Sequence, residues 1–410
     1  MTTEQLILSI GTILLVARLC GWIFLQIRQP RVVGEMVAGI LLGPSFFGRF
    51  FPGSFSHVFP ASALPTISVL SQLGLLLFMF VVGVEVDLKR VLKQGKAVVL
   101  ISNVSILLPL ALGIAMAKTL YPEFAGLKVP FPTFALFMGA AMSVTAFPVL
   151  ARILKERDLL GTSLGTVSIS CAAIDDISAW LLLAVLTAMA HSYQGWSHLW
   201  FSMFFLALFI FMMLVPVRWI VSRLEFRYRD RPASIESISV LILFMLAASW
   251  TTERLQVHAL FGAFMAGLVL PKSGMMEEAV ERIESLSVAL LLPLFFALTG
   301  LRTRIDLLTD KVMWEYALAI MAIAVAGKLA GAAFTAKLTG MNWRDSVGLG
   351  ALMNTRGLVE LVILNAGLDL GILSPSLFTM LVLMALATTF MASPALDALG
   401  INRSRETKTS

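Results

Sequence analysis

The sequence predicts an all-α polytopic membrane protein with about 13 transmembrane helices, because apolar stretches of about 20 residues, the length that a bilayer requires, recur along the whole chain. Of its 410 residues, 58% are hydrophobic and only 14% are charged. Soluble domains carry about a quarter charged residues. This composition excludes an ordinary soluble domain.

The order of the expected spans and the positions of the basic residues suggest an orientation. The spans are centred near residues 15, 39, 75, 108, 143, 174, 208, 242, 263, 292, 325, 355 and 386. If the N-terminus lies outside, most of the 31 Lys and Arg residues fall in inner loops. By the positive-inside rule we expect a plasma (inner) membrane protein with a cytoplasmic C-terminus. The basic residues of the inner loops then account for the net charge of +6, and no nucleic-acid partner is expected.

Three pairs of similar segments suggest an inverted repeat. GEMVAGILLGP (34–44) resembles GAFMAGLVLP (262–271), LFMFVVG (77–83) resembles LFFALTG (294–300), and GAAMSVTAFPVL (139–150) resembles GALMNTRGLVEL (350–361). Partners are an odd number of spans apart, so they cross the membrane in opposite directions. We therefore expect a first repeat at 1–190, a connector span at 191–232, a second repeat at 233–398, and a short cytoplasmic tail at 399–410.

The third pair of segments predicts two interrupted helices. Ser143, Thr145 and Pro148 interrupt one span near its middle, and Asn354, Thr355 and Gly357 interrupt its counterpart. Matching interrupted helices are a good pointer to a transporter's binding site. An alternative for Ser143 and Thr145 is hydroxyl bonding back onto an intact helix.

Charges beside the second interruption fit the dipoles of half-helices. Arg356 follows the end of the first half-helix, where the dipole is negative, and Glu360 lies in the first turn of the second, where it is positive. We group Asn354 with them as a residue that compensates the broken helix. Alternatively, Arg356 and Glu360 form an i, i+4 pair that only stabilises the helix.

Asp175 and Asp176 lie at the centre of an otherwise apolar span, in ISCAAIDDISAWLLLAV (169–185), and Lys328 lies near the centre of another. Charges at that depth are costly and normally mark an ion or proton path. We expect Asp175, Asp176, Thr145, Ser143 and Lys328 to bind ions or protons, with Asp176, Asp175 and Thr145 as ligands of a monovalent cation. The alternative is a purely structural Asp–Lys bridge.

The motifs SVTAFPVLARIL, AAIDDISAW, FGAFMAGLVLP, FFALTGL and GLGALMNTRGLVELVIL together resemble those of the monovalent cation:proton antiporter family 2, over about residues 5–398. The resemblance implies a core domain with two crossed broken helices, a dimerisation domain and an elevator-like motion. It also implies that Asp175 and Asp176 bind the ion, that Thr145, Arg356 and Glu360 belong to the crossovers, and that Lys328 is the intramembrane lysine.

These observations predict a secondary antiporter that exchanges Na⁺, with Li⁺ and K⁺ as alternative cations, for H⁺. We expect electrogenic exchange, a homodimer in the bilayer, a role in pH homeostasis and no cofactor. The rivals are a K⁺/H⁺ efflux antiporter and a sodium-coupled organic-anion symporter. An intramembrane aspartyl protease is excluded, because it needs catalytic aspartates on two spans and a Gly-x-Gly-Asp setting that this sequence lacks.

Overall fold

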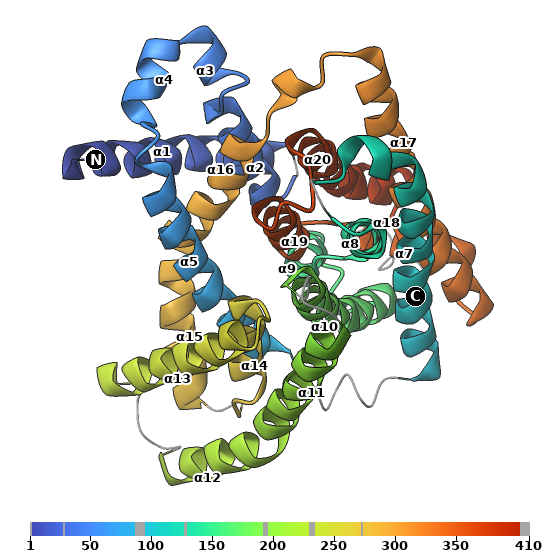
Figure 1. Ribbon diagram of the computed structural model, residues 1–410. Coiled ribbons are helices and arrows are strands. Elements are labelled where there is room, and N and C mark those ends of the chain that lie inside the picture. The colour runs from blue at the N-terminus through green and yellow to red at the C-terminus, as the bar shows by residue number, and fades with distance from the viewer. Residues whose placement is uncertain are drawn as a thin grey trace. The chain divides into compact units, whose positions relative to one another are not determined.

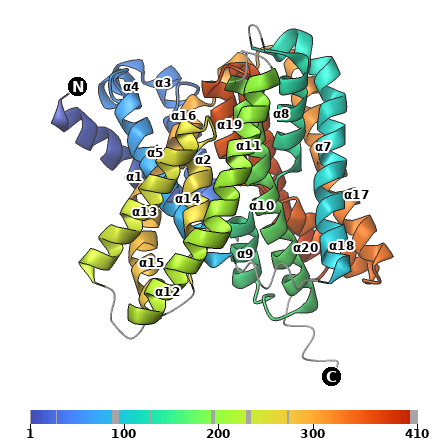
Figure 2. The ribbon, with the colours of Figure 1, turned by 60° about the horizontal axis from the view of Figure 1, so that its bottom comes forward.

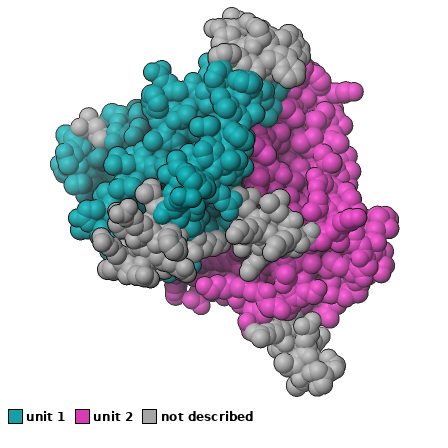
Figure 3. All heavy atoms as spheres, turned by 90° about the horizontal axis from the view of Figure 1, so that it is seen from below, with its two compact units in different colours: residues 1–14, 56–90, 183–298 teal, residues 15–55, 91–182, 299–410 magenta. Residues whose placement is uncertain are grey.

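The computed structural model describes residues 2–27, 29–86, 95–126, 129–191, 196–228, 234–271 and 274–401. These residues form helices joined by loops (Figure 1), with one isolated β-bridge between Ala125 and Leu373. The chain divides into two compact units, coloured separately in Figure 3. One unit contains residues 1–14, 56–90 and 183–298, and the other contains residues 15–55, 91–182 and 299–410.

The described residues contain 12 helical segments long and apolar enough to cross a membrane, and a shorter apolar helix at the ninth expected span, near residue 263. That helix, α14 (Ala259–Leu268), has ten residues and is about 15 Å long, half of the hydrocarbon thickness of about 30 Å. Pro271 follows shortly after its end, and proline cannot continue a helix. The expected span therefore exists as a half-length helix.

The first unit contains most of the helices from the middle of the sequence. Its elements are α5 (Leu64–Glu85), α11 (Trp196–Met212), the π-helix η1 (Met213–Val217), α12 (Arg218–Tyr228), α13 (Ile235–Arg254), α14, α15 (Gly274–Leu286), the π-helix η2 (Ser287–Leu291) and the start of α16 (Leu292–Arg302). Gly83 on α5 and Gly267 on α14 face each other so closely that a Cβ on either would meet the other helix's backbone. Small residues permit such close helix packing within membranes.

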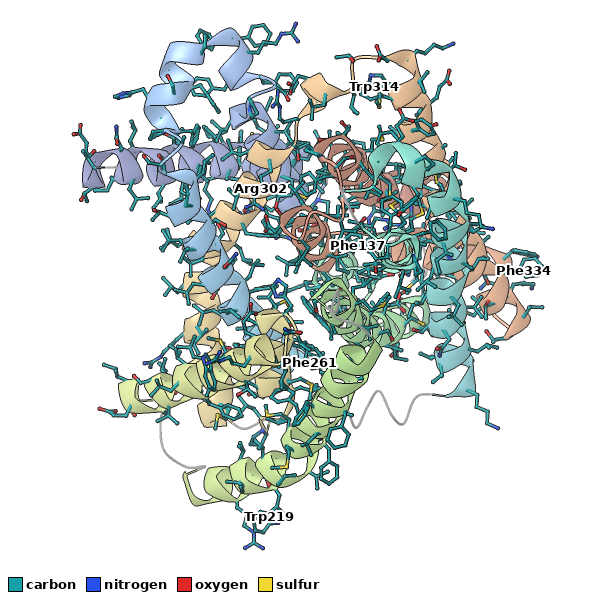
Figure 4. All side chains as sticks on the ribbon, in the orientation of Figure 1. Phe137, Trp219, Phe261, Arg302, Trp314 and Phe334 are labelled. Carbon is teal, nitrogen blue, oxygen red and sulfur yellow. The ribbon has the colours of Figure 1, made fainter. Side chains whose placement is uncertain are left out.

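The second unit contains the broken helices. Its elements are the second half of α1 (Thr3–Gln26), α2 (Arg31–Leu42), α3 (Phe47–Phe50), the start of α4 (Pro52–Val58), α7 (Lys96–Phe124), α8 (Phe131–Ser143), α9 (Phe147–Glu156), most of α10 (Ser163–His191), the end of α16, the 3-10 turn η3 (Ile305–Leu307), α17 (Lys311–Leu338), α18 (Trp343–Met353), α19 (Leu358–Asp369) and α20 (Pro375–Ala398). Helix α7 packs against α8 and α17, and α17 packs against α18 and α20 (Figure 2). Helices α8 and α19 also pack closely. The ring of Phe137 on α8, labelled in Figure 4, occupies the space that a Cβ on Gly367 of α19 would need.

Both expected interruptions are present, and they contact each other. Residues 144–146 separate α8 from α9, and residues 354–357 separate α18 from α19. The Ala146 amide donates to the Thr355 carbonyl at 3.0 Å, so the two breaks cross. Pro148 lies in the first turn of α9, where its missing N–H is tolerated but a continuous helix is not.

The proposed repeat boundaries remain a prediction. The similar segments fall on α2 and α14, on α5 and α16, and on the broken pairs α8–α9 and α18–α19. Residues 192–195 and 229–233 of the expected connector, and 402–410 of the expected tail, lie outside the described residues.

Candidate functional site

Two adjacent carboxylates lie in the middle of α10, away from solvent. Asp175 is 1% exposed, and Asp176 is 0% exposed. Because α10 continues unbroken through both positions, the two side chains leave the helix about 100° apart. The two carboxylates therefore have different surroundings.

Asp175 belongs to a fully buried ion pair with several hydrogen bonds. The Lys328 ammonium on α17 donates to Asp175 Oδ2 at 2.8 Å, and both side chains are fully buried. The Ser102 hydroxyl on α7 donates to Asp175 Oδ1 at 2.7 Å, and Ser105 Oγ lies 3.5 Å from Oδ2. A buried ion pair is tolerated only when its remaining hydrogen-bonding positions are satisfied in this way.

Thr145 joins Asp175 to the second broken helix. Its Oγ1 lies 2.8 Å from Asp175 Oδ2 and 2.8 Å from the Met353 carbonyl, at the end of α18. A hydroxyl has one proton, so it donates to one of these acceptors at a time. Thr145 does not bond back onto its own helix, whereas Ser143 does, donating to the Ala140 carbonyl at 3.0 Å. The back-bonding alternative therefore describes Ser143, whose role as an ion ligand stays a prediction.

Of the two adjacent carboxylates, Asp176 is the one with an unpartnered oxygen. Its Oδ1 accepts the Phe147 amide of α9 at 3.4 Å, so the carboxylate lies at the positive N-terminus of a half-helix. Its Oδ2 is buried and has no hydrogen-bond partner among the described residues. An unsatisfied buried charged oxygen is costly, so this atom requires a proton or a cation.

Arg356 and Glu360 form a second buried pair, within the second crossover. Arg356 Nη1 donates to Glu360 Oε1 at 3.0 Å, and both side chains are fully buried. The guanidinium also donates to the carbonyls of Ala141 at 2.6 Å and Met142 at 2.8 Å. These carbonyls belong to the last turn of α8, so the Arg356 side chain satisfies the negative end of the other broken helix.

Comparison with known proteins shows the family to which the chain belongs. Residues 13–400 match the family model described as "Sodium/hydrogen exchanger, transmembrane". The chain belongs to the sodium/hydrogen exchanger family.

Its relatives within that family include proteins from bacteria and yeast. The chain is 39% identical over 399 residues to the Na(+)/H(+) antiporter NhaS4 of Synechocystis sp., covering 96% of this chain and 97% of that protein. It is 35% identical over 398 residues to the K(+)/H(+) antiporter 1 of Saccharomyces cerevisiae, covering 93% of this chain and 45% of the yeast protein. The chain thus spans about half the length of the yeast relative.

A solved structure supports the fold of this sodium/hydrogen exchanger. The sodium proton antiporter MjNhaP1 from Methanocaldococcus jannaschii matches with a TM-score of 0.71 at 13% identity, covering 98% of this chain and 100% of that one. The sequence prediction of an all-α antiporter-like membrane fold is confirmed. Membership of the family also makes this multi-pass membrane protein a transporter rather than an enzyme.

Several side chains that complete the site of this exchanger are not predicted by its sequence. Ser102 and Ser105 on α7 contact Asp175, and the Thr389 hydroxyl on α20 accepts the Arg356 amide at 2.9 Å. The three-residue spacing of Ser102 and Ser105, on one face of an apolar helix, was the one sequence signal available. Nothing in the sequence around Thr389 indicates its contact.

Proposed function

We propose that this member of the sodium/hydrogen exchanger family exchanges Na⁺ for H⁺ across the membrane by alternating access, with Asp176 as the site that both ions share. The observation that carries the proposal is the buried Asp176 Oδ2 without a hydrogen-bond partner, at the N-terminus of a broken helix. A carboxylate in that position can hold a cation or a proton in turn. Because both occupants need the same oxygen, neither gradient dissipates through the site.

Thr145 and Asp175 are the proposed neighbours of the bound cation. The Thr145 hydroxyl can turn its proton toward the Met353 carbonyl and present its lone pairs to a cation, since it lies 2.8 Å from that carbonyl. Asp175 lies on the same helix as Asp176 and supplies a second negative charge. Hydroxyl and carboxylate oxygens are the ligands that hard cations prefer.

The Asp175–Lys328 pair is proposed as the source of voltage dependence. Exchange of one cation for two protons moves one net charge, worth about 2.3 kcal/mol per 100 mV. If Asp175 turns to the cation, Lys328 loses its partner at 2.8 Å and releases a proton, because an unpaired buried ammonium is costly.

The voltage proposal is tested in liposomes with an imposed potassium diffusion potential and Na⁺ as substrate. Asp175→Asn should leave exchange measurable but weaken its response to voltage. Wild-type exchange that does not change when valinomycin clamps the voltage at zero would overturn the electrogenic proposal and leave the Asp175–Lys328 pair as a structural bridge.

A K⁺/H⁺ exchanger is the second candidate. The yeast relative is named a K(+)/H(+) antiporter, whereas the Synechocystis relative is named a Na(+)/H(+) antiporter. The pair of carboxylates, Asp175 and Asp176, supports Na⁺, because the family resemblance implies Asn or Gln in place of the first aspartate in electroneutral or potassium-linked members.

The proposed function is tested by exchange in proteoliposomes with an internal pH dye, adding Na⁺, Li⁺ and K⁺ separately. We expect a Na⁺-driven pH change with a smaller response to K⁺. A response to K⁺ alone would support the second candidate, and no response to any cation would refute exchange.

The orientation and assembly are also proposals. The positions of the basic residues support an outer N-terminus and a cytoplasmic C-terminus in the plasma membrane. The family resemblance supports a homodimer, and the three pairs of similar segments support the repeat boundaries given above. Topology reporters fused to each terminus test the orientation, and light scattering of the purified protein tests the dimer.

A further inference from the structure

Asn354 has a buried amide oxygen that no contact explains. The residue ends α18 at the second break, and its backbone N–H donates to the Gly350 carbonyl at 3.2 Å. Its side chain is almost entirely buried, with the residue 4% exposed. Asn354 Oδ1 has no hydrogen-bond partner in the part of the chain that the structure describes, although an amide oxygen accepts two hydrogen bonds in water. A buried, unsatisfied acceptor of this kind is costly, and a bound ligand would satisfy it.

The backbone around Asn354 is tied to the segment that also holds Asp176. The residue before it, Met353, has its carbonyl 2.8 Å from Thr145 Oγ1. The residue after it, Thr355, accepts the Ala146 amide at 3.0 Å. The next amide along that segment, from Phe147, donates to Asp176 Oδ1. Asn354 and Asp176 therefore flank the same short stretch of extended chain.

We propose that Asn354 Oδ1 is a ligand of the transported cation, together with Asp176 Oδ2. This inference rests on the proposed function. Side-chain amide oxygens bind hard cations, as carboxylates do, and these two oxygens are both buried and both unpartnered. Helix compensation does not account for Asn354, because its oxygen accepts nothing from the broken helices.

The amide oxygen also distinguishes between the two ions. A carboxylate binds a proton or a cation, whereas an amide stays neutral and unprotonated in proteins. Asn354 therefore stabilises the cation-bound state without stabilising the protonated state. It shifts the competition at Asp176 toward the cation, and at a fixed Na⁺ concentration it lets exchange reach half of its maximum at a lower pH.

The test compares Asn354→Leu with Asn354→Asp in proteoliposomes. Leucine has the same branching and the same number of side-chain heavy atoms as asparagine but no oxygen. We therefore expect about a tenfold rise in the KM for Na⁺, the effect of losing one hydrogen-bond-strength contact to a charge. The maximal rate should stay within about twofold. Aspartate keeps the oxygen and adds charge, so its KM should equal the wild-type value or fall below it.

Asn365→Leu is the matched control, since it makes the same substitution on the adjoining half-helix α19. Asn365 is also buried, at 8% exposure, but its amide donates to Thr299 Oγ1 at 2.9 Å and its Oδ1 accepts from Arg302 at 3.0 Å. Arg302 is labelled in Figure 4. Asn365→Leu should lower the melting temperature and leave the KM for Na⁺ unchanged, whereas Asn354→Leu should raise the KM and leave the melting temperature unchanged in choline chloride.

A second readout, independent of transport, is the rise in melting temperature when NaCl replaces choline chloride. That rise should be present in the wild type and Asn354→Asp and reduced in Asn354→Leu. An unchanged KM in Asn354→Leu, or a KM raised in Asn354→Asp as much as in Asn354→Leu, would overturn the inference. Absence of exchange in the wild type would instead refute the proposed function, so the two failures are distinguishable.

Discussion

The two broken helices of the second unit cross at the same place, but their charges are arranged differently. At the second break, Arg356 and Glu360 neutralise each other at 3.0 Å. At the first break, the carboxylate at the N-terminus of α9, Asp176, contacts a backbone amide and no cationic side chain of the described residues. The two neighbouring aspartates differ as well, because Asp175 pairs with Lys328 at 2.8 Å, a pair proposed above to open when the cation binds, whereas Asp176 Oδ2 has no such partner.

This contrast indicates which charges form a framework and which exchange ions. A buried charge with a permanent partner holds the structure in one arrangement, and removing either partner leaves an uncompensated charge. A buried carboxylate without a permanent partner must acquire one, and in a transporter of this family the available partners are a cation and a proton. We therefore propose that Arg356 and Glu360 belong to the framework and that Asp176 belongs to the transport cycle.

The largest effect on transport is expected at Asp176. Asp176→Asn should abolish Na⁺-driven pH change in proteoliposomes, because an amide carries no negative charge and cannot take up the transported proton. The protein should remain folded, since the amide oxygen can still accept the Phe147 amide. Asp310→Asn, the same change at an exposed carboxylate that precedes α17, is the control and should exchange normally. Robust exchange by Asp176→Asn would show that Asp176 is not the residue that exchanges ions, and it would contradict the proposed functional difference between the two breaks.

The largest effect on stability is expected at Arg356. Arg356→Met leaves Glu360 buried without its cation and leaves the carbonyls of Ala141 and Met142 without their donors, so it should lower the free energy of unfolding by about 3–5 kcal/mol. Chemical denaturation in detergent measures this loss. Adding Glu360→Gln should recover part of it, because the uncompensated charge is then gone. A folded, fully stable Arg356→Met protein would show that this pair is not the framework proposed here.

A smaller effect is expected at Thr145, which contacts both breaks. Thr145→Val keeps the shape but removes one oxygen, so the KM for Na⁺ should rise about threefold to tenfold. Thr388→Val is the control, because the Thr388 hydroxyl donates only within α20, to the Met384 and Ala385 carbonyls at 2.8 Å and 3.1 Å. If Thr145→Val loses thermal stability while the surviving protein keeps a normal KM, the hydroxyl is structural.

The sequence was sufficient to locate the two breaks and the charges near them. Pro148 and Gly357 mark the interruptions, and Asp175, Asp176 and Lys328 are conspicuous because charge is rare in apolar spans. The direction of the Arg356 side chain was not accessible in this way. Its carbonyl partners lie more than 200 residues earlier, and only the crossing of α8 with the second break brings them together.

Which side chains hydrogen-bond to each other within the site also depends on the tertiary structure. Ser102 was not expected to contact Asp175, since the two lie 73 residues apart on different helices. Thr145 and Ser143 are both hydroxyl residues at one break, yet only Ser143 bonds back to its own helix. The difference arises because α8 ends at Ser143, which leaves Thr145 in extended chain beside Met353.

In the proposed transport cycle, a cation and a proton compete for Asp176. The most direct measurement is proton release when NaCl is added to the purified protein in weakly buffered detergent solution, with choline chloride as the blank. We expect the wild type to release protons in proportion to bound Na⁺, with the apparent Na⁺ affinity weakening as pH falls, and Asp176→Asn to release none. Proton release by Asp176→Asn equal to that of the wild type, or a Na⁺ affinity that does not change with pH, would contradict this competition.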